Sequence, residues 1–270
     1  MEKTILLTGA TDGIGLETAK MLVAQGHRIL LHGRNRAKLE AVKHTLSGLR
    51  HDARLETFVA DLSRMADVAA LAHSVAETHR QLDGLINNAG VFKVTETVTA
   101  DGLDTRFAVN TVAPYLLTQR LLPLFGASGR VVNLSSAAQA PVDPLALAGD
   151  ARVTDDFAAY AQSKLALTMW TRAVAGTLGD AGPVIVAVNP GSLLATKMVK
   201  DGFGMAGNDI GIGADILCRA ALSEEFAGAS GLYFDNDSGR FAAPHADARD
   251  PARCAHIVRV IEEIMARTGQ

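Results

Sequence analysis

Short apolar stretches alternate along this chain with longer stretches of helical periodicity. Runs of β-branched or apolar residues predict strands at Thr4–Thr8, Arg28–His32, Arg54–Ala60, Gly84–Asn87, Arg130–Leu134, Val184–Asn189 and Gly231–Phe234. Helical patterns fall between most of them, for example at Ile14–Gln25, Arg36–Leu46, Met65–His79, Gly102–Phe125 and Asp156–Leu178. Such alternation is typical of right-handed βαβ units. It predicts an α/β fold, a Rossmann-type doubly wound parallel sheet of about seven strands with helices on both faces.

The pattern gives no sign of a second domain, so residues 1–270 are expected to form one domain. The most irregular stretch is Gly191–Gly213, which follows a predicted strand and contains several glycines. A substrate loop is one interpretation of this stretch, and a plain surface connection is the other. Its position after a sheet strand favours the loop.

Composition narrows the function classes. Hydrophobic residues make up 48% and charged residues 20% of the chain, and the net charge is −3, which gives no reason to expect nucleic-acid or membrane-surface binding. No apolar run approaches the roughly 20 residues of a membrane span. Cys218 and Cys254 are far apart and outside any CxxC motif, so reduced thiols in a cytoplasmic protein are expected. The histidines are scattered without metal-ligand spacing.

A glycine-rich turn follows the first predicted strand and opens the first helix. It reads Thr8-Gly9-Ala10-Thr11-Asp12-Gly13-Ile14-Gly15. Glycines permit a tight turn and close approach to a pyrophosphate, and a helix N-terminus offers free N–H groups to it. A merely structural turn is the alternative. The turn predicts dinucleotide contacts from Gly9, Thr11, Asp12, Gly13, Ile14 and Gly15.

The end of the second predicted strand bears on cofactor choice. An acidic residue there binds the ribose of NAD, whereas an arginine suits the 2′-phosphate of NADP. The strand ends in Leu31-His32-Gly33-Arg34-Asn35-Arg36, without a carboxylate. Arg34 is placed to bind a phosphate, with Asn35 beside it, so NADP(H) is predicted over NAD(H). A solvated basic turn is the alternative.

Tyr160 and Lys164 are four residues apart in a predicted helix, so their side chains project to the same side. A free phenol has a pKa of about 10, and working near neutrality needs a shift of roughly 3 units. One cation at about 4 Å supplies energy of that order at an effective dielectric of about 20. The pair is therefore a candidate general acid/base in which Lys164 lowers the pKa of Tyr160.

Taken together, the motifs resemble those of the short-chain dehydrogenase/reductase family. The turn has the spacing T-G-x-x-x-G-x-G, Asn87-Asn88-Ala89-Gly90 matches the family's N-N-A-G element, and Pro190-Gly191 matches its turn after the sixth strand. Four further residues match its catalytic tetrad: Asn110, Ser136, Tyr160 and Lys164. The resemblance covers essentially the whole chain.

The resemblance implies a role for each member of the tetrad. Tyr160 would donate or remove the proton of the substrate oxygen, Ser136 would hydrogen-bond that oxygen, and Lys164 would bind the nicotinamide ribose. Asn110 would hold a water that relays protons to Lys164. Ser135 is the neighbouring alternative to Ser136, and the family pattern favours Ser136.

It also implies further cofactor contacts. Asp61 would face the adenine, with Leu62 next to it. The remaining implied contacts are Asn88, Ala89, Gly90, Tyr160, Lys164, Pro190, Gly191 and Thr196. Thr196 lies one residue later after Pro190-Gly191 than in the common pattern, which makes its contact with the nicotinamide carboxamide less secure.

The long interval between Ser136 and Tyr160 points to a sub-branch. Together with the stretch Tyr160–Arg172 and the C-terminal region around Gly231–Phe234 and Ala248–Ile264, it resembles the retinol-dehydrogenase-like branch. The resemblance also implies a homodimer through the helices Gly102–Phe125 and Asp156–Leu178. Asp235–Gly239 is interpreted as a turn rather than a calcium loop, and Trp170 as a packing residue.

The leading hypothesis is therefore an NADP(H)-dependent oxidoreductase that interconverts a small or apolar carbonyl compound and its alcohol. Two alternatives stay open: an NAD-dependent dehydrogenase of the same fold, and a non-catalytic NADP(H)-binding redox sensor. The sensor has no need of Ser136, Tyr160 and Lys164 together, which favours the enzyme.

Overall fold

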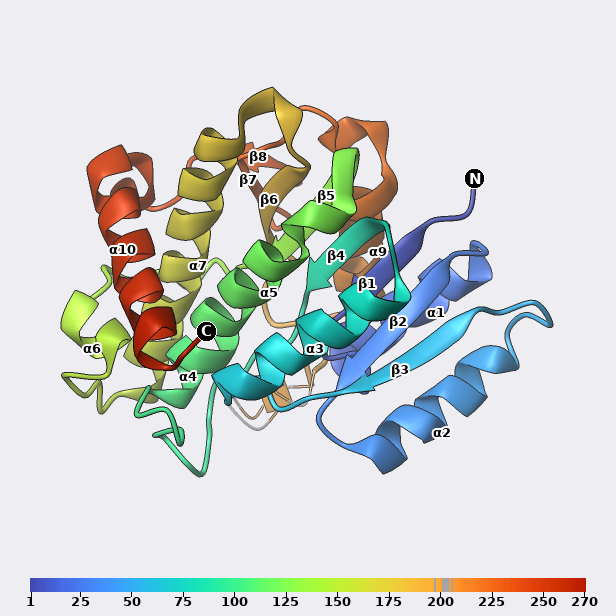
Figure 1. Ribbon diagram of the computed structural model, residues 1–270, viewed down its shortest axis with the longest axis horizontal. Coiled ribbons are helices and arrows are strands. Elements are labelled where there is room, and N and C mark those ends of the chain that lie inside the picture. Colours follow the sequence, from blue (N-terminus) through green and yellow to red (C-terminus); the bar gives the residue numbers. More distant parts are fainter. Residues whose placement is uncertain (197, 201–203, 205) are drawn as a thin grey trace.

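The core of the molecule is an eight-stranded sheet in the order β3-β2-β1-β4-β5-β6-β7-β8 (Figure 1). The computed structural model describes residues 1–196, 198–200, 204 and 206–270. The strands are β1 (Thr4–Leu7), β2 (Arg28–Gly33), β3 (Leu55–Val59), β4 (Leu82–Asn87), β5 (Phe125–Leu134), β6 (Val184–Asn189), β7 (Tyr233–Asp235) and β8 (Arg240–Ala242). The first seven pair in parallel, as predicted. The strand order reverses between β1 and β4, which places the ligand crevice of such a sheet at their carboxyl ends.

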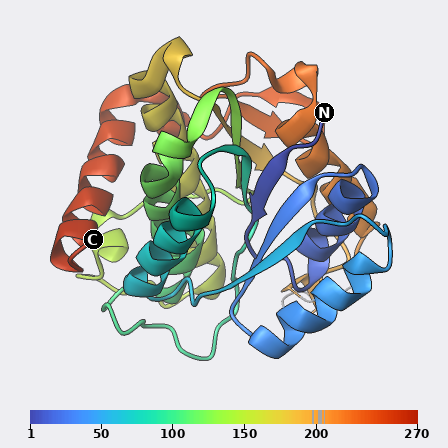
Figure 2. The same cartoon turned by 45° about the vertical axis from the view of Figure 1, so that its right-hand side comes forward.

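Helices cover both faces of the sheet (Figures 1 and 2). On one face lie α3 (Met65–Thr78), α5 (Ala113–Leu121), α7 (Asp156–Leu178) and, outermost, α10 (Pro251–Arg267). On the other lie α1 (Gly13–Ala24), α2 (Arg36–Ser47) and α9 (Ile210–Leu222). Each face has its own apolar cluster, because side chains of successive strand residues point to opposite sides: Leu6 belongs to one cluster, and its neighbours Ile5 and Leu7 to the other.

The sheet has one strand more than expected, the edge strand β8. It pairs antiparallel with β7 and follows the turn formed by the segment after Asp235, so the interpretation of Asp235–Gly239 as a turn is confirmed. Three residues of weak periodicity, Arg240–Ala242, form β8. A strand this short carries too little alternation to be recognised in the sequence.

The predicted single helix Gly102–Phe125 is wrong in detail. The structure has α4 (Thr105–Phe107), a π-helical turn η1 (Ala108–Val112), α5, and the 3₁₀ turn η2 (Leu122–Leu124), and β5 already begins at Phe125. Pro114 explains the interruption, because it has no N–H to donate to the carbonyl of Asn110, four residues earlier. Single π turns of this kind are frequent at functional sites, and this one contains Asn110.

The predicted loop Gly191–Gly213 ends earlier than expected. α9 begins at Ile210, and the Asp209 carboxylate caps it by accepting from the Gly211 N–H at 2.8 Å. Residues 197, 201–203 and 205 of this stretch, with Gly202 among them, lie outside the described residues. The loop is closed by a β-bridge between Leu194 and Asn208.

The C-terminal helix α10 packs along the outer side of α7 (Figure 1). It also reaches α5, where the Tyr115 hydroxyl donates to the Glu262 carboxylate at 3.1 Å. Trp170 of α7 is completely buried and meets Tyr115 edge to face at 5.5 Å, which confirms its role in packing. The remaining short elements are α6 (Pro144–Ala148), η3 (Gly179–Ala181), η4 (Glu224–Phe226) and η5 (Ala246–Arg249). Within the described part of the chain, no helix is long and apolar enough to cross a membrane.

Candidate active site

The glycine turn between β1 and α1 is tightly constrained. Gly9 and Gly13 have φ of +67° and +55°, a region that side chains disfavour. A Cβ on Gly15 would lie 2.2 Å from the Gly9 carbonyl oxygen. The first turn of α1 can therefore lie this close to the glycine turn only because residue 15 is a glycine. Asp12 caps α1 by accepting from the Gly13 N–H at 2.7 Å. The turn therefore has the close backbone approach that the sequence predicts.

The N-terminus of α1 offers unpaired donors to an anion. The N–H groups of Ile14 and Gly15 belong to the first helical turn and have no acceptor within the helix. The helix dipole adds a partial positive charge at the same place. Thr11 packs over the end of β2, since a Cβ on Gly33 would lie 2.8 Å from the Thr11 methyl.

Asn88, Ala89 and Gly90 follow β4 and pack against the glycine turn. The Asn88 amide donates to the carbonyls of Thr8 at 2.8 Å and Gly9 at 3.2 Å, and the Ala89 N–H donates to the Thr8 hydroxyl at 3.1 Å. A Cβ on Gly90 would lie 3.4 Å from both Asn110 Oδ1 and Lys164 Nζ. The N-N-A-G segment thus connects the predicted cofactor turn to the predicted catalytic residues.

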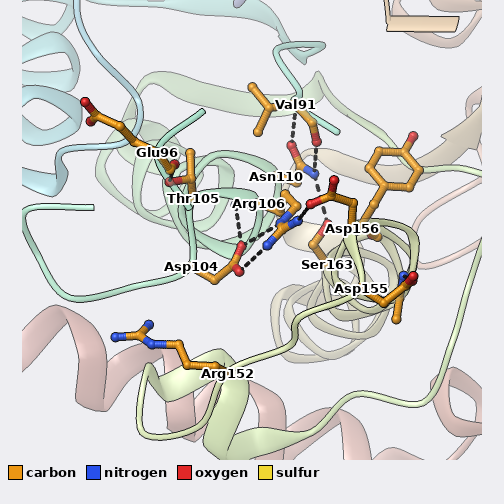
Figure 3. A network of polar contacts seen from close by, with 12 residues as sticks. Val91, Glu96, Asp104, Thr105, Arg106, Asn110, Arg152, Asp155, Asp156 and Ser163 are labelled. Carbon is orange, nitrogen blue, oxygen red and sulfur yellow. Dashed lines mark hydrogen bonds and ion pairs between the residues drawn. The ribbon is translucent and has the colours of Figure 1, made fainter. Parts of the chain in front are cut away.

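The Asn110 amide is buried and joins two segments (Figure 3). It donates to the Val91 carbonyl and to the Ser163 hydroxyl, both at 2.9 Å, and accepts from the Val91 N–H at 2.8 Å. Ser163 in turn donates to the Tyr160 carbonyl at 2.7 Å. Both donor hydrogens of the Asn110 amide are therefore used to hold the loop after β4 against α7.

The two serines after β5 have different surroundings. Ser135 is buried, and its hydroxyl pairs with that of Thr168 at 2.7 Å, inside the contact with α7. The Ser136 hydroxyl accepts from the Ala138 N–H at 3.1 Å, and its side-chain interaction with the Tyr160 phenol acts to lower the pKa of that phenol. Of the two, Ser136 is the one that faces the predicted acid/base.

Tyr160 and Lys164 lie on the same side of α7, with Lys164 Nζ 5.7 Å from the centre of the Tyr160 ring. The expectation that Lys164 lowers the pKa of Tyr160 is wrong for this geometry. Burial raises the pKa of Tyr160, and the hydrogen bond with Ser136 lowers it only in part. Lys164 is itself buried, donates to the Leu134 carbonyl at 2.7 Å, and has its pKa lowered by burial to about 8. Loss of hydration outweighs the attraction that the spacing alone suggests.

Sequence reasoning missed a buried ion-pair network beside this pair. Arg106 of α4 is 1% exposed and binds Asp104 through two hydrogen bonds, of 2.9 and 2.6 Å. Its remaining nitrogen contacts Asp156, the first residue of α7 (Figure 3). Asp156 stands one helical turn before Tyr160. Arg106–Asp156 and Asn110–Ser163 are thus two successive cross-links from the η1 region to the start of α7.

The predicted adenosine contacts lie at the ends of β2 and β3. Arg34 directly follows β2 and is exposed, and Asn35 caps α2 by accepting from the Lys38 N–H at 3.0 Å. Asp61 follows β3, and one of its carboxylate oxygens accepts from the N–H and the hydroxyl of Ser63 at 3.0 and 2.8 Å. Leu62 is buried beneath this turn.

The turn after β6 is supported by the β7–β8 hairpin. The Asn236 amide donates to the Pro190 carbonyl at 2.9 Å, and the Asp237 carboxylate accepts from the Ser192 N–H at 2.7 Å. Gly191 has a φ of +117°. The sequence does not predict these contacts, because nothing in the Asp235–Gly239 turn indicates that it packs against the turn after β6.

Thr196 approaches the glycine turn, since its methyl group would lie 3.7 Å from a Cβ on Gly13. Its hydroxyl accepts from the Val199 N–H at 3.2 Å. The segments after β1 and β6 therefore meet at one edge of the sheet.

An aromatic cluster adjoins the phenol. The Phe92 ring meets that of Tyr160 at 5.2 Å and that of Phe157 at 6.3 Å, both edge to face. Phe92 is buried, but Phe157 is 48% exposed. The surroundings of Tyr160 on this side are apolar.

Comparisons with known proteins show the family to which the chain belongs. A family model described as short chain dehydrogenase matches residues 3–205. Human retinol dehydrogenase 13 is 31% identical over 269 residues, covering 93% of this chain and 81% of that protein. Bovine retinol dehydrogenase 12 is 33% identical over 257 residues, covering 90% and 81%. The chain belongs to the short-chain dehydrogenase family, in its retinol-dehydrogenase-like branch, and is an oxidoreductase acting on CH–OH and C=O groups.

A solved structure shares the fold and adds a ligand. A short chain dehydrogenase from Burkholderia cenocepacia in complex with NADP superposes with a TM-score of 0.70 and is 28% identical, covering 88% of this chain and 97% of that one. In the present chain, the glycine cradle, the free N–H groups of α1 and the exposed Arg34 form a donor set that fits a dinucleotide phosphate.

Proposed function

We propose that this protein is an NADP(H)-dependent oxidoreductase that interconverts an aldehyde or ketone and its alcohol, with Tyr160 as general acid/base. The observation that carries the proposal is the meeting of Tyr160 with Ser136 on one side and Lys164 on the other, next to Gly90 of the segment that contacts the glycine turn. A proton donor and an oxygen-binding hydroxyl thus stand beside a dinucleotide cradle, at the carboxyl edge of the sheet.

Each residue of the proposed tetrad has its own role in the reaction. The Ser136 hydroxyl binds the substrate oxygen, and the Tyr160 phenol gives that oxygen a proton in reduction or removes one in oxidation. The raised pKa of Tyr160 keeps the phenol protonated near neutrality, which suits it as the acid of a reduction. The Lys164 ammonium, whose pKa is about 8, is still charged at pH 7 and is held by the Leu134 carbonyl. Asn110 fixes α7 relative to the loop after β4.

The cofactor would be held by the segments that end the strands. The N–H groups at the start of α1 suit the pyrophosphate, Asp61 and Leu62 the adenine, and Pro190, Gly191 and Thr196 the nicotinamide side. Asn88 and Ala89 hold the glycine turn in place through their hydrogen bonds to Thr8. When bound, the nicotinamide supplies or accepts the hydride.

Preference for NADP(H) is supported by Arg34. It is exposed directly after β2, where an arginine suits a 2′-phosphate. A charge-assisted hydrogen bond contributes about 1.5–3 kcal/mol. We therefore expect Arg34→Asp to raise the KM for NADPH by roughly 10- to 100-fold and to leave the KM for NADH nearly unchanged. Lys38→Asp, in the first turn of α2, is the matched control for charge alone.

We propose a cytoplasmic location, supported by Cys218 and Cys254, which are both free and buried. Cell fractionation tests it. A homodimer through α5 and α7 stays a prediction from the family. Because α10 lies along α7, such a dimer would have to form over or beside α10. Light scattering that gives a monomeric mass would refute it.

The test of the function is oxidation of NADPH and of NADH by the full chain, across a panel of aldehydes and ketones. We expect turnover with NADPH on apolar carbonyl compounds, because Phe92 and Phe157 adjoin the phenol. Equal or better turnover with NADH would sink the NADP preference and favour an NAD-dependent dehydrogenase. Tight NADPH binding without any turnover would favour the redox sensor.

A further inference from the structure

His32 is a buried base that the proposed chemistry does not use. It is the next-to-last residue of β2 and is 2% exposed. Both of its ring nitrogens have backbone partners: Nδ1 lies 3.3 Å from the Gly9 nitrogen, and Nε2 lies 3.1 Å from the Ala60 oxygen. A carbonyl only accepts and an N–H only donates, so Nε2 carries the hydrogen and Nδ1 accepts. The surroundings thus fix one neutral tautomer.

Burial supports the neutral form. It lowers the pKa of His32 to about 4, although the hydrogen bond with the Ala60 carbonyl and the Asp61 carboxylate act the other way. The imidazole is therefore uncharged at any pH at which the protein is expected to work, and Nδ1 is free to accept the Gly9 N–H.

The two hydrogen bonds join segments that are far apart in the sequence. Gly9 belongs to the turn after β1, and Ala60 directly precedes Asp61 after β3. The His32 carbonyl also accepts from the Ala10 N–H at 2.9 Å. One residue therefore holds two successive residues of the glycine turn and ties them to the end of β3.

This arrangement sets the distance between the two parts of the proposed cofactor site. Gly9 has a left-handed φ, and its carbonyl is held from the other side by the Asn88 amide. With the Gly9 N–H bound to His32 as well, the peptide groups on both sides of Gly9 are fixed in orientation. Donors fixed in advance bind a ligand without a further cost of ordering.

We propose that His32 is a positioning residue for the cofactor, which holds the pyrophosphate-binding turn in place and sets the affinity for the adenine dinucleotide. It touches neither substrate nor reacting atoms, so it governs cofactor binding and not the rate of the reaction. The inference rests on the proposed function, in which the glycine turn binds the dinucleotide.

Two substitutions separate the two hydrogen bonds. In His32→Gln the side-chain amide nitrogen takes the place of Nε2 and keeps the bond to Ala60, but the acceptor for Gly9 is lost. In His32→Asn the amide oxygen takes the place of Nδ1, so the Gly9 bond is kept and the Ala60 bond is lost.

His27 provides a matched control. It lies at the opposite end of β2, and its Nδ1 accepts from the Lys3 N–H at 3.2 Å, just before β1. Both histidines thus accept an N–H from a residue that flanks β1. His27→Gln removes the same kind of bond at the edge of the sheet away from the glycine turn.

The experiment measures the Kd for NADPH by cofactor fluorescence, and kcat at saturating NADPH, in the full-length protein and the three variants. We expect His32→Gln to raise the Kd roughly 10-fold, because the Gly9 N–H loses its acceptor and the turn must then be ordered when the cofactor binds. We expect kcat to stay within about two-fold, His32→Asn to keep most of the affinity, and His27→Gln to bind as the wild type.

The outcomes separate the inference from the function on which it rests. Wild-type protein that binds neither NADPH nor NADP⁺ overturns the proposed function. If it binds and His32→Gln binds equally well, or loses kcat and not affinity, the positioning role is overturned. Should His32→Gln not fold, the comparison of His32→Asn with His27→Gln decides: an affinity lost in full by His32→Asn contradicts the primary role of the Gly9 bond.

Discussion

His32 of β2 and Lys164 of α7 are two buried basic side chains at the carboxyl ends of the strands, and burial affects their charge differently at neutral pH. His32, beside the glycine turn, is held neutral by burial, which lowers its pKa to about 4, and both of its ring nitrogens have backbone partners. Lys164, beside the phenol, has one backbone partner and a pKa of about 8. At pH 7 the imidazole is therefore uncharged and the ammonium is still charged. At this pH, burial of the neutral His32 has no charge-desolvation cost, whereas burial of the charged Lys164 lowers the stability of the fold.

The difference matches what the two regions have to do. The proposed cofactor region needs fixed backbone donors, and neutral groups such as His32 and Asn88 are enough to hold them. The proposed catalytic region needs a positive charge close to a reacting proton. The Lys164 ammonium is therefore required there although its burial lowers the stability of the fold. Perturbed groups at functional sites commonly carry such a cost.

The largest expected effect comes from removing the phenol oxygen. Positioned acid/base groups contribute roughly 100- to 10,000-fold, so Tyr160→Phe should lower kcat by about 1,000-fold and leave the Kd for NADPH within about two-fold. Tyr115→Phe is the control, since it removes a buried hydroxyl that binds Glu262 away from the site. Substantial turnover by Tyr160→Phe in a single-turnover assay would show that the acid is misassigned.

Lys164→Met tests the cost of the buried charge. Burial lowers the Lys164 pKa from 10.5 to about 8. That shift corresponds to about 3 kcal/mol, an upper bound because the Leu134 carbonyl loses its donor. We expect the variant to be inactive yet more stable towards urea at pH 7. Wild-type stability should rise between pH 8 and 10.5 relative to the variant, because there the unfolded chain binds more protons. Lys20→Met, at a half-exposed lysine that pairs with Glu17, should show neither effect.

His32 should affect the folding stability at acid pH, whereas Lys164 affects it at alkaline pH. Its folded pKa of about 4 lies below the ordinary 6.5, so between these values the unfolded chain takes up a proton that the folded chain does not. Stability from this group is complete above about pH 6.5 and falls by up to about 3 kcal/mol as the pH drops to 4. Urea unfolding between pH 7.5 and 4 measures this. A His32→Asn variant with the wild-type acid slope would assign the slope to other groups.

The smallest expected effect is in the network that positions α7. Asp156→Asn weakens the contact with Arg106 and keeps the Asp104 pair, so the first turn of α7 is less firmly held. We expect kcat to fall about 10-fold with little change in Tm. Asp155→Ala removes the N-cap of the same helix, whose carboxylate accepts from the Ala158 N–H. It should lower stability by about 1 kcal/mol and spare kcat. The reverse pattern would make Arg106–Asp156 a purely structural contact.

Features that depend on neighbouring residues can be predicted from the sequence. The glycine turn and the Tyr160–Lys164 spacing are each defined within a few residues, and strand and helix periods predicted the parallel sheet. The interruption of the helix around Asn110 also had a local signal, Pro114, which was overlooked.

What could not be predicted depends on distant residues and on burial. Arg106 and Asp156 are 50 residues apart in the sequence, and Ser192 and Asp237 are 45 residues apart. No periodicity links either pair. The pKa of Tyr160 was predicted with the wrong direction because spacing gives the distance to a charge but not the loss of water around both groups. His32 likewise reads as an ordinary strand residue until its two backbone partners are seen.

The packing of α10 along α7 has a consequence for dilute protein. The helix that contains Tyr160 and Lys164 is covered by a segment of its own chain, whose effective concentration does not change when the protein is diluted. A second copy could add contacts outside α10 but is not needed to provide this cover. The support of the proposed acid/base pair should therefore persist at concentrations where an assembly held together by two chains would separate.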